Sequence, residues 1–158
     1  MQEKPRLDTL LSVSNPVFRT YVICVVILSL KMTMNAWHQV QRFMSSSGYG
    51  MRNPEDLKPG PLNPRPNPQQ IKPFEPVERL RRIMGHDLEN NLGFFMVGYL
   101  YALLNAGEAW PLWLYTGCKM LHHVVYLTAQ PHEVRATCWT VMNMAFVYMC
   151  FKVLTAVL

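Results

Sequence analysis

The sequence predicts an all-α integral membrane protein, a bundle of four helices that cross the bilayer. Half of its 158 residues are apolar or aromatic, and 16% are charged, against about 25% in an average soluble protein. The apolar residues gather in four runs. Because lipid cannot satisfy the polar groups of an open backbone, each run is expected to form a helix. Four runs leave no room for a soluble domain, so residues 1–158 are taken as a single membrane domain.

The first apolar run predicts a span over about residues 17–37. Its segment Tyr21–Leu28 is rich in β-branched residues and resembles a buried strand, but the full run is long enough to cross about 30 Å of hydrocarbon as a helix. A signal peptide is the alternative. It fits poorly, because no small-x-small cleavage site follows and the run continues directly into Lys31 and Met32.

The remaining runs predict spans over about residues 90–105, 110–129 and 136–158. A polar helical stretch, Val77–Asn91, leads into the second span, and Lys152 is the one charged residue of the fourth. All four cysteines lie inside apolar runs, where free cysteine behaves as a small hydrophobic residue, so a disulfide scaffold is not expected.

A proline-rich loop over about residues 45–76 separates the first two spans. It holds eight of the twelve prolines, which predicts an extended, polyproline-like segment without a fold of its own. Residues 38–82 carry eight Lys or Arg against four Asp or Glu. By the positive-inside rule the loop is cytoplasmic and both termini face the lumen. A basic face with stacking aromatics outside the membrane is missing, so no nucleic-acid partner is expected.

Polar side chains follow helical stripes through the apolar runs. One stripe, at i, i+4, i+7 and i+11, consists of Lys31, Asn35, His38 and Arg42. A second, at i, i+3, i+7 and i+10, consists of Arg79, Arg82, His86 and Glu89, and a third of Lys119, His122 and Tyr126, while Arg135 precedes the fourth run. Ionisable groups inside membrane helices mark functional sites by default, and a basic cavity suits an anionic ligand with several carboxylates. Glutathione fits this description, although periodicity does not name it.

Simpler interpretations exist for single residues of these stripes. Basic side chains at helix ends commonly anchor a helix at the interface, and this is the expectation for Lys31 or Lys119 taken singly. Arg79 and Arg82 could form ordinary ion pairs with Glu78 and Glu89 along the helix. A metal site at His122-His123 is not expected, because adjacent residues point about 100° apart on a helix and cannot face one ion.

Several segments resemble the MAPEG family, the membrane-associated proteins in eicosanoid and glutathione metabolism. They run in the family's order from Lys31 to the end of the chain: Lys31-Met32, Asn53-Pro54-Glu55-Asp56, Val77-Glu78-Arg79 followed by Arg82, Asp87-Leu88-Glu89-Asn90, His122, Tyr126-Leu127 and Arg135. The block from Val77 to Asn90 is the most specific. The pattern is most similar to the branch of microsomal glutathione transferases and microsomal prostaglandin E synthases.

The resemblance implies a homotrimer in the endoplasmic reticulum membrane, with the mitochondrial outer membrane as an alternative, and glutathione bound at each subunit interface. The glutathione contacts that it implies are Arg79, Arg82, Glu89, His122, Tyr126 and Arg135, with Arg42 as a weaker match. It also implies that Arg135 acts on the thiol and that Asp56 is the loop aspartate implicated in the prostaglandin branch. His86 stands where the family usually has an asparagine contact, and a neighbouring basic position is Gly85.

These features predict a glutathione-dependent transferase that attacks lipophilic electrophiles or lipid peroxides, which reach it from the membrane lipid. Ala136 and Trp139 depart from the prostaglandin synthase pattern and favour conjugation. The first alternative is a glutathione-dependent prostaglandin E synthase. A second, of another class, is a non-catalytic adaptor that presents lipids, for which loss of the thiol-activating arginine would be expected, whereas Arg135 is present.

The basic loop yields a test of orientation. In sealed microsomes, a protease added to the cytoplasmic side should cleave between Ser45 and Pro76, because the positive loop stays on that side. Immunoblotting with antibodies to both termini would map the fragments, and detergent-opened microsomes provide the control for protease access. Protection of the loop together with cleavage near Glu108 would reverse the assigned orientation.

Overall fold

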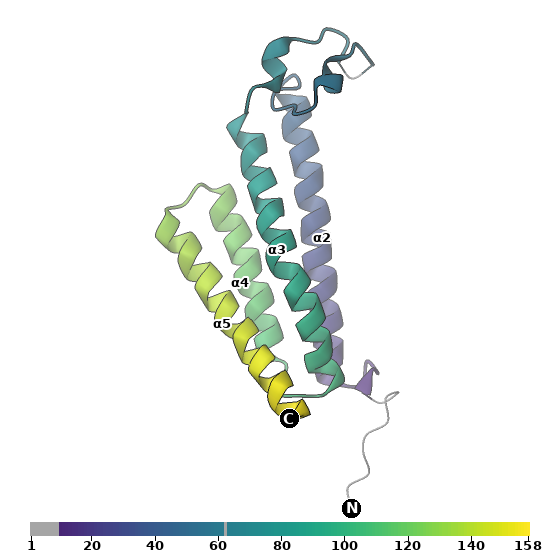
Figure 1. The fold of residues 1–158 in the computed structure, drawn as a ribbon, viewed down its shortest axis with the longest axis vertical. Coiled ribbons are helices and arrows are strands. Elements are labelled where there is room, and N and C mark those ends of the chain that lie inside the picture. Colours follow the sequence, from purple (N-terminus) through teal and green to yellow (C-terminus); the bar gives the residue numbers. More distant parts are fainter. Residues whose placement is uncertain (1–9, 62) are drawn as a thin grey trace, which may run out of the picture. The chain divides into compact units, whose positions relative to one another are not determined.

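A computed structural model describes residues 10–61 and 63–158, and within them the chain is all-α with no strand (Figure 1). Its α-helices are α2 (Pro16–Ser45), α3 (Glu75–Leu103), α4 (Trp110–Leu127) and α5 (His132–Val157). Two short 3-10 helices, η1 (Pro54–Leu57) and η2 (Pro68–Ile71), lie between α2 and α3. Each of the four apolar runs therefore overlaps one α-helix.

The helices extend beyond the apolar runs that predict them. In the described residues, α2 and α5 are long and apolar enough to cross a membrane by composition. α3 begins at Glu75, well before the span expected from residue 90, because the charged stretch Val77–Asn91 continues the same helix. Acidic residues in its first turn, Glu75 and Glu78, suit the positive end of the helix dipole.

Three α-helices end in the same backbone arrangement, in which a residue other than glycine takes the left-handed conformation. Ser47, Asn105 and Ala129 adopt positive φ angles of 57°, 46° and 56°, just after α2, α3 and α4. At the end of α4, the amide of Gln130 donates to the carbonyl of Val125 over 3.1 Å, the 6→1 bond of a Schellman motif. The left-handed position of this motif usually carries glycine, since other side chains are strained there.

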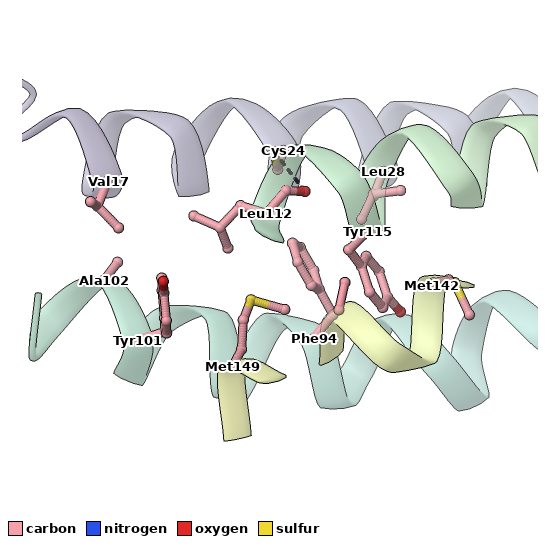
Figure 2. Packing of buried hydrophobic residues seen from close by; sticks show 11 residues of the cluster. Val17, Cys24, Leu28, Phe94, Tyr101, Ala102, Leu112, Tyr115, Met142 and Met149 are labelled. Atoms are coloured by element: carbon pink, nitrogen blue, oxygen red, sulfur yellow. Dashed lines mark hydrogen bonds between the residues drawn. The ribbon is translucent and has the colours of Figure 1, made fainter. Parts of the chain in front are cut away.

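The described chain forms two compact units, to which α2 and α3 both contribute residues. The first unit comprises residues 10–31 and 87–158 and contains an apolar core supplied by all four α-helices (Figure 2). Phe94 of α3 stacks on Tyr115 of α4 with ring centroids 4.1 Å apart. Helices α4 and α5 pack side by side, and the buried face of α5 carries Met142, Ala145 and Met149.

A charged cluster lies inside the first unit, on the helices that also form its apolar core. Lys31 of α2 and Lys119 of α4 both donate toward Oδ1 of Asp87 on α3, the latter from 3.3 Å. The three side chains are 3%, 1% and 2% exposed, in the order Lys31, Lys119, Asp87. The anchor interpretation of Lys31 and Lys119 is therefore wrong. Neither ammonium reaches outward, because each is held by the buried carboxylate.

The second unit, residues 32–86, orders the proline-rich loop around one buried glutamine. Gln70 is 5% exposed, and its Nε2 donates to the carbonyl of Ser47 over 2.7 Å. The backbone carbonyl of Gln70 accepts hydrogen bonds from the backbone amides of Gly50 and Met51, both over 2.9 Å. Its side chain completes a capping box with Asn67. The loop therefore has more structure than the extended segment that its composition predicts, since these bonds fold it back on itself.

The charged cluster predicts an asymmetric response to substitution. Asp87→Leu leaves two buried cations without their carboxylate and should destabilise the protein by about 3–5 kcal/mol. Lys119→Met leaves Lys31 paired with Asp87 and removes the excess charge, so the change should stay within about 1 kcal/mol or favour the fold. Thermal unfolding in one detergent measures both variants. Equal destabilisation by the two would show that charge balance does not govern this cluster.

Candidate functional site

The first turns of α3 bring two of the predicted glutathione contacts onto one carboxylate. Nη2 of Arg82 lies 2.6 Å from Oε1 of Glu75, and Nη2 of Arg79 lies 3.1 Å from the same oxygen. These hydrogen bonds, that from Arg82 foremost, hold the pKa of Glu75 below its ordinary value. Glu75 is therefore a carboxylate at neutral pH. Arg79 and Arg82 converge on a single anion in the way a ligand carboxylate would require.

A second ion-pair cluster lies beside the first in the sequence. Glu78 is bound by Arg81 within α3 and by Arg52 from the loop. Partial burial raises the pKa of Glu78, but the two guanidinium groups outweigh it and the net pKa is lowered. Arg81 also donates to the carbonyl of Gly50 over 2.7 Å. Glu78 and Glu89 were the expected partners of Arg79 and Arg82. Both arginines bind Glu75, and Arg52 and Arg81 bind Glu78.

The other predicted residues of the second unit are more separate. Nε of Arg42 donates to Nε2 of His38 over 3.1 Å, as expected for two residues four apart on one helical stripe. Asp56 lies in η1 with an exposed side chain, and its backbone carbonyl accepts from Asn63. His86 is half-buried near the middle of α3.

The first unit brings together three predicted residues at the end of the α4–α5 pair. The His122 and Tyr126 rings, both buried on α4, have centroids 5.7 Å apart. The guanidinium carbon of Arg135, in the first turn of α5, lies 4.8 Å from the centroid of Tyr126. This distance is typical of a cation–π contact. Glu89, the fourth predicted residue of this unit, is exposed on α3.

The turn between α4 and α5 places Arg135. Thr128 ends α4, Ala129 takes the left-handed conformation, and α5 begins at His132. Within the described residues, Nε of Arg135 is buried and makes no hydrogen bond. A buried donor without an acceptor is costly, so this position would favour a ligand that brings an acceptor or a negative charge.

An apolar groove of about 550 Å³ starts one helical turn beyond Arg135 along α5. It is lined by Trp139, Thr140, Asn143, Met144, Val147, Tyr148 and Phe151. The sequence pattern singles out Trp139 but not the groove, because the fourth run is apolar on every side of the helix and so does not indicate which side lines a groove. Glu75 was also missed. Its spacing of four and seven residues from Arg79 and Arg82 was the available signal, but Pro76 obscured the start of the helix.

A model of the MAPEG family matches residues 20–155, nearly the whole length. The chain belongs to the MAPEG family. A comparison with individual curated proteins gives no significant match. As a MAPEG protein it is an integral membrane helical bundle, and its membership is consistent with a glutathione-dependent function in a membrane.

Proposed function

We propose that this MAPEG protein is a glutathione transferase that activates the glutathione thiol against lipophilic electrophiles or lipid peroxides. The observation that carries the proposal is the position of Arg135. Its guanidinium packs on Tyr126, its Nε is buried without an acceptor among the described residues, and an apolar groove begins one turn away. A cation next to an apolar groove suits a reaction between an anionic sulfur and a lipophilic molecule.

Arg135 would supply the activation. A free thiol with a pKa of about 8.5 is only a few per cent ionised at pH 7. A guanidinium near the sulfur in a poorly solvated place favours the thiolate, and each unit of pKa lowering corresponds to about 1.4 kcal/mol. In conjugation the sulfur then forms a bond to an electrophilic carbon while the bond from that carbon to its leaving group breaks. The thiol proton passes to solvent and the leaving group departs as an anion.

The remaining residues would bind the peptide. Arg79 and Arg82 already share one carboxylate, and the same fork would hold a carboxylate of glutathione. Glu89, His86 and His122 would form hydrogen bonds with the polar groups of glutathione. The resemblance to the family adds Arg42 as a further contact and Asp56 as the loop aspartate. A homotrimer in the endoplasmic reticulum membrane belongs to the same proposal.

The experiment uses the purified full chain in detergent with glutathione. It offers in parallel a chlorinated nitroaromatic and a prostaglandin endoperoxide. Conjugation of the nitroaromatic is the expected outcome. Turnover of the endoperoxide alone would make the protein a prostaglandin E synthase instead. Binding of either lipophilic molecule without turnover would make it a non-catalytic adaptor and overturn the proposal.

Arg135→Leu should lower turnover at least about 100-fold, the usual cost of removing one electrostatic stabiliser of a reacting anion. Glutathione binding, measured by equilibrium dialysis, should persist, and the ultraviolet difference band of bound thiolate should disappear. Arg135→Lys should restore activity in part, because a compact ammonium lacks the guanidinium fork. Lys152→Leu removes a cation near the far end of α5 and is the matched control. Near-normal turnover and an intact thiolate band in Arg135→Leu would assign activation to another group.

Glu75 should act as an internal competitor for the peptide. Because Glu75 already occupies Arg79 and Arg82, a ligand carboxylate must displace it. Glu75→Gln should therefore tighten glutathione binding about two- to fivefold, the range of an exposed ion pair. Glu55→Gln, which neutralises an exposed carboxylate of the loop, is the control. Weaker binding in Glu75→Gln would mean that this carboxylate orients the two arginines rather than competing for them.

A further inference from the structure

The second unit contains a cavity that the proposed function does not use. Its volume is about 620 Å³, and it lies between the last turns of α2 and the proline-rich loop. Val40, Phe43 and Met44 of α2 form an apolar side. The loop supplies a polar side that includes Asn63, Asn67 and Arg65. The cavity is thus amphipathic, with its polar groups gathered on one element.

The loop side of this cavity is held in place by buried hydrogen bonds. The Gln70 side chain donates to the Ser47 carbonyl and exchanges hydrogen bonds with Asn63, which also lines the cavity. Gly48 lies against this side chain with a φ of +83°, and a Cβ there would lie 2.9 Å from Gln70 Nε2. A larger residue at position 48 would therefore push against Gln70, so this side of the cavity depends on the glycine.

The apolar side continues along α2 as a groove of about 670 Å³. Trp37, Val40, Gln41, Met44 and Ser45 line it, so that the groove and the cavity share Val40 and Met44. Trp37 is 76% exposed, and Met44 is 61% exposed. Tryptophan side chains favour the boundary between hydrocarbon and headgroups, so Trp37 marks the end of the groove nearest the hydrocarbon, and the groove and the cavity extend from there toward the loop.

The charge of the cavity comes from Arg65. Four other arginines of this unit are bound to Glu75 or Glu78. Among the described residues, Arg65 has no hydrogen bond or ion pair, and its side chain is exposed at the cavity wall. An anion that enters the cavity would therefore meet a cation that no carboxylate occupies.

We propose that the cavity and its groove bind one anionic phospholipid from the leaflet on the side of the proline-rich loop. The headgroup lies against Arg65 and the amides of Asn63 and Asn67, and an acyl chain follows Met44 and Val40 toward Trp37. The order of these groups along α2 matches the order of groups along a phospholipid. A soluble anion would use Arg65 but leave the groove empty, whereas a second copy of this chain would need no cation at Arg65.

The test compares lipid selectivity in native mass spectrometry. The full-length protein is released from mixed micelles that contain equal amounts of phosphatidylserine and phosphatidylcholine. The two lipids carry the same acyl chains. Wild-type protein should retain phosphatidylserine preferentially. Arg65→Gln should lower the ratio of retained phosphatidylserine to phosphatidylcholine about fivefold, which corresponds to about 1 kcal/mol for one basic residue near an anionic headgroup. Lys58→Gln, which removes an exposed cation of the same loop outside the cavity, should leave the ratio unchanged.

Met44→Ser separates the two halves of the proposed site. It should lower the retention of both lipids without changing their ratio, because it removes part of the groove and leaves Arg65 in place. Circular dichroism of each variant verifies that the helices are intact. Competition by chain-free glycerophosphoserine as strong as that by the intact lipid would reveal a plain anion site and overturn the proposal. Two results together would assign the groove to a second copy of the protein: an unchanged ratio of the two lipids in Arg65→Gln, and a changed number of protein subunits per complex in Met44→Ser.

Discussion

The charge of Asp87 is the constraint on which the first unit depends. A carboxylate and two ammonium groups are almost completely buried on three helices that also supply the apolar core. None of the three could remain there singly, because a buried charge without a partner costs several kcal/mol. Together they bring a specific turn of α2, α3 and α4 to one point. Apolar packing such as the Phe94–Tyr115 stack tolerates small shifts of one helix past another, whereas this contact does not.

The second unit uses charge in a different way. The two ion pairs of Glu75 are solvent-accessible, and such pairs contribute at most about 1 kcal/mol each. The proposed binding of a ligand carboxylate by Arg79 and Arg82 would therefore cost little in lost pairing with Glu75. In this chain the buried charges therefore fix the helices against one another, whereas the charges at the start of α3 remain accessible to solvent.

Sequence reasoning found the helices and missed most of their partners. Four apolar runs were sufficient to predict the all-α fold, because length and composition are local properties. Helix ends were harder, because Ser47, Asn105 and Ala129 occupy positions where a glycine would have been the signal. Lys31 was interpreted as an anchor because its carboxylate lies 56 positions away in the chain, and no local pattern connects the two. The helical spacing of Arg79 and Arg82 could be seen in the sequence. Their shared partner, Glu75, could not be placed on the same helix, because Pro76 follows it and made residue 75 look like part of the loop.

The turn from Thr128 to Pro131 has a consequence for how this protein can vary. It joins the helix that carries Tyr126 to the helix that carries Arg135, and its left-handed Ala129 fixes the direction in which α5 leaves α4. Insertion or deletion of one residue here would shift the start of α5 relative to α4, and where the change falls within the helix before Arg135 it would turn that side chain by about 100° about the axis of α5. The guanidinium would then leave the tyrosine ring while both helices remained intact. We therefore expect related chains to tolerate many residue types in this turn but to keep its length.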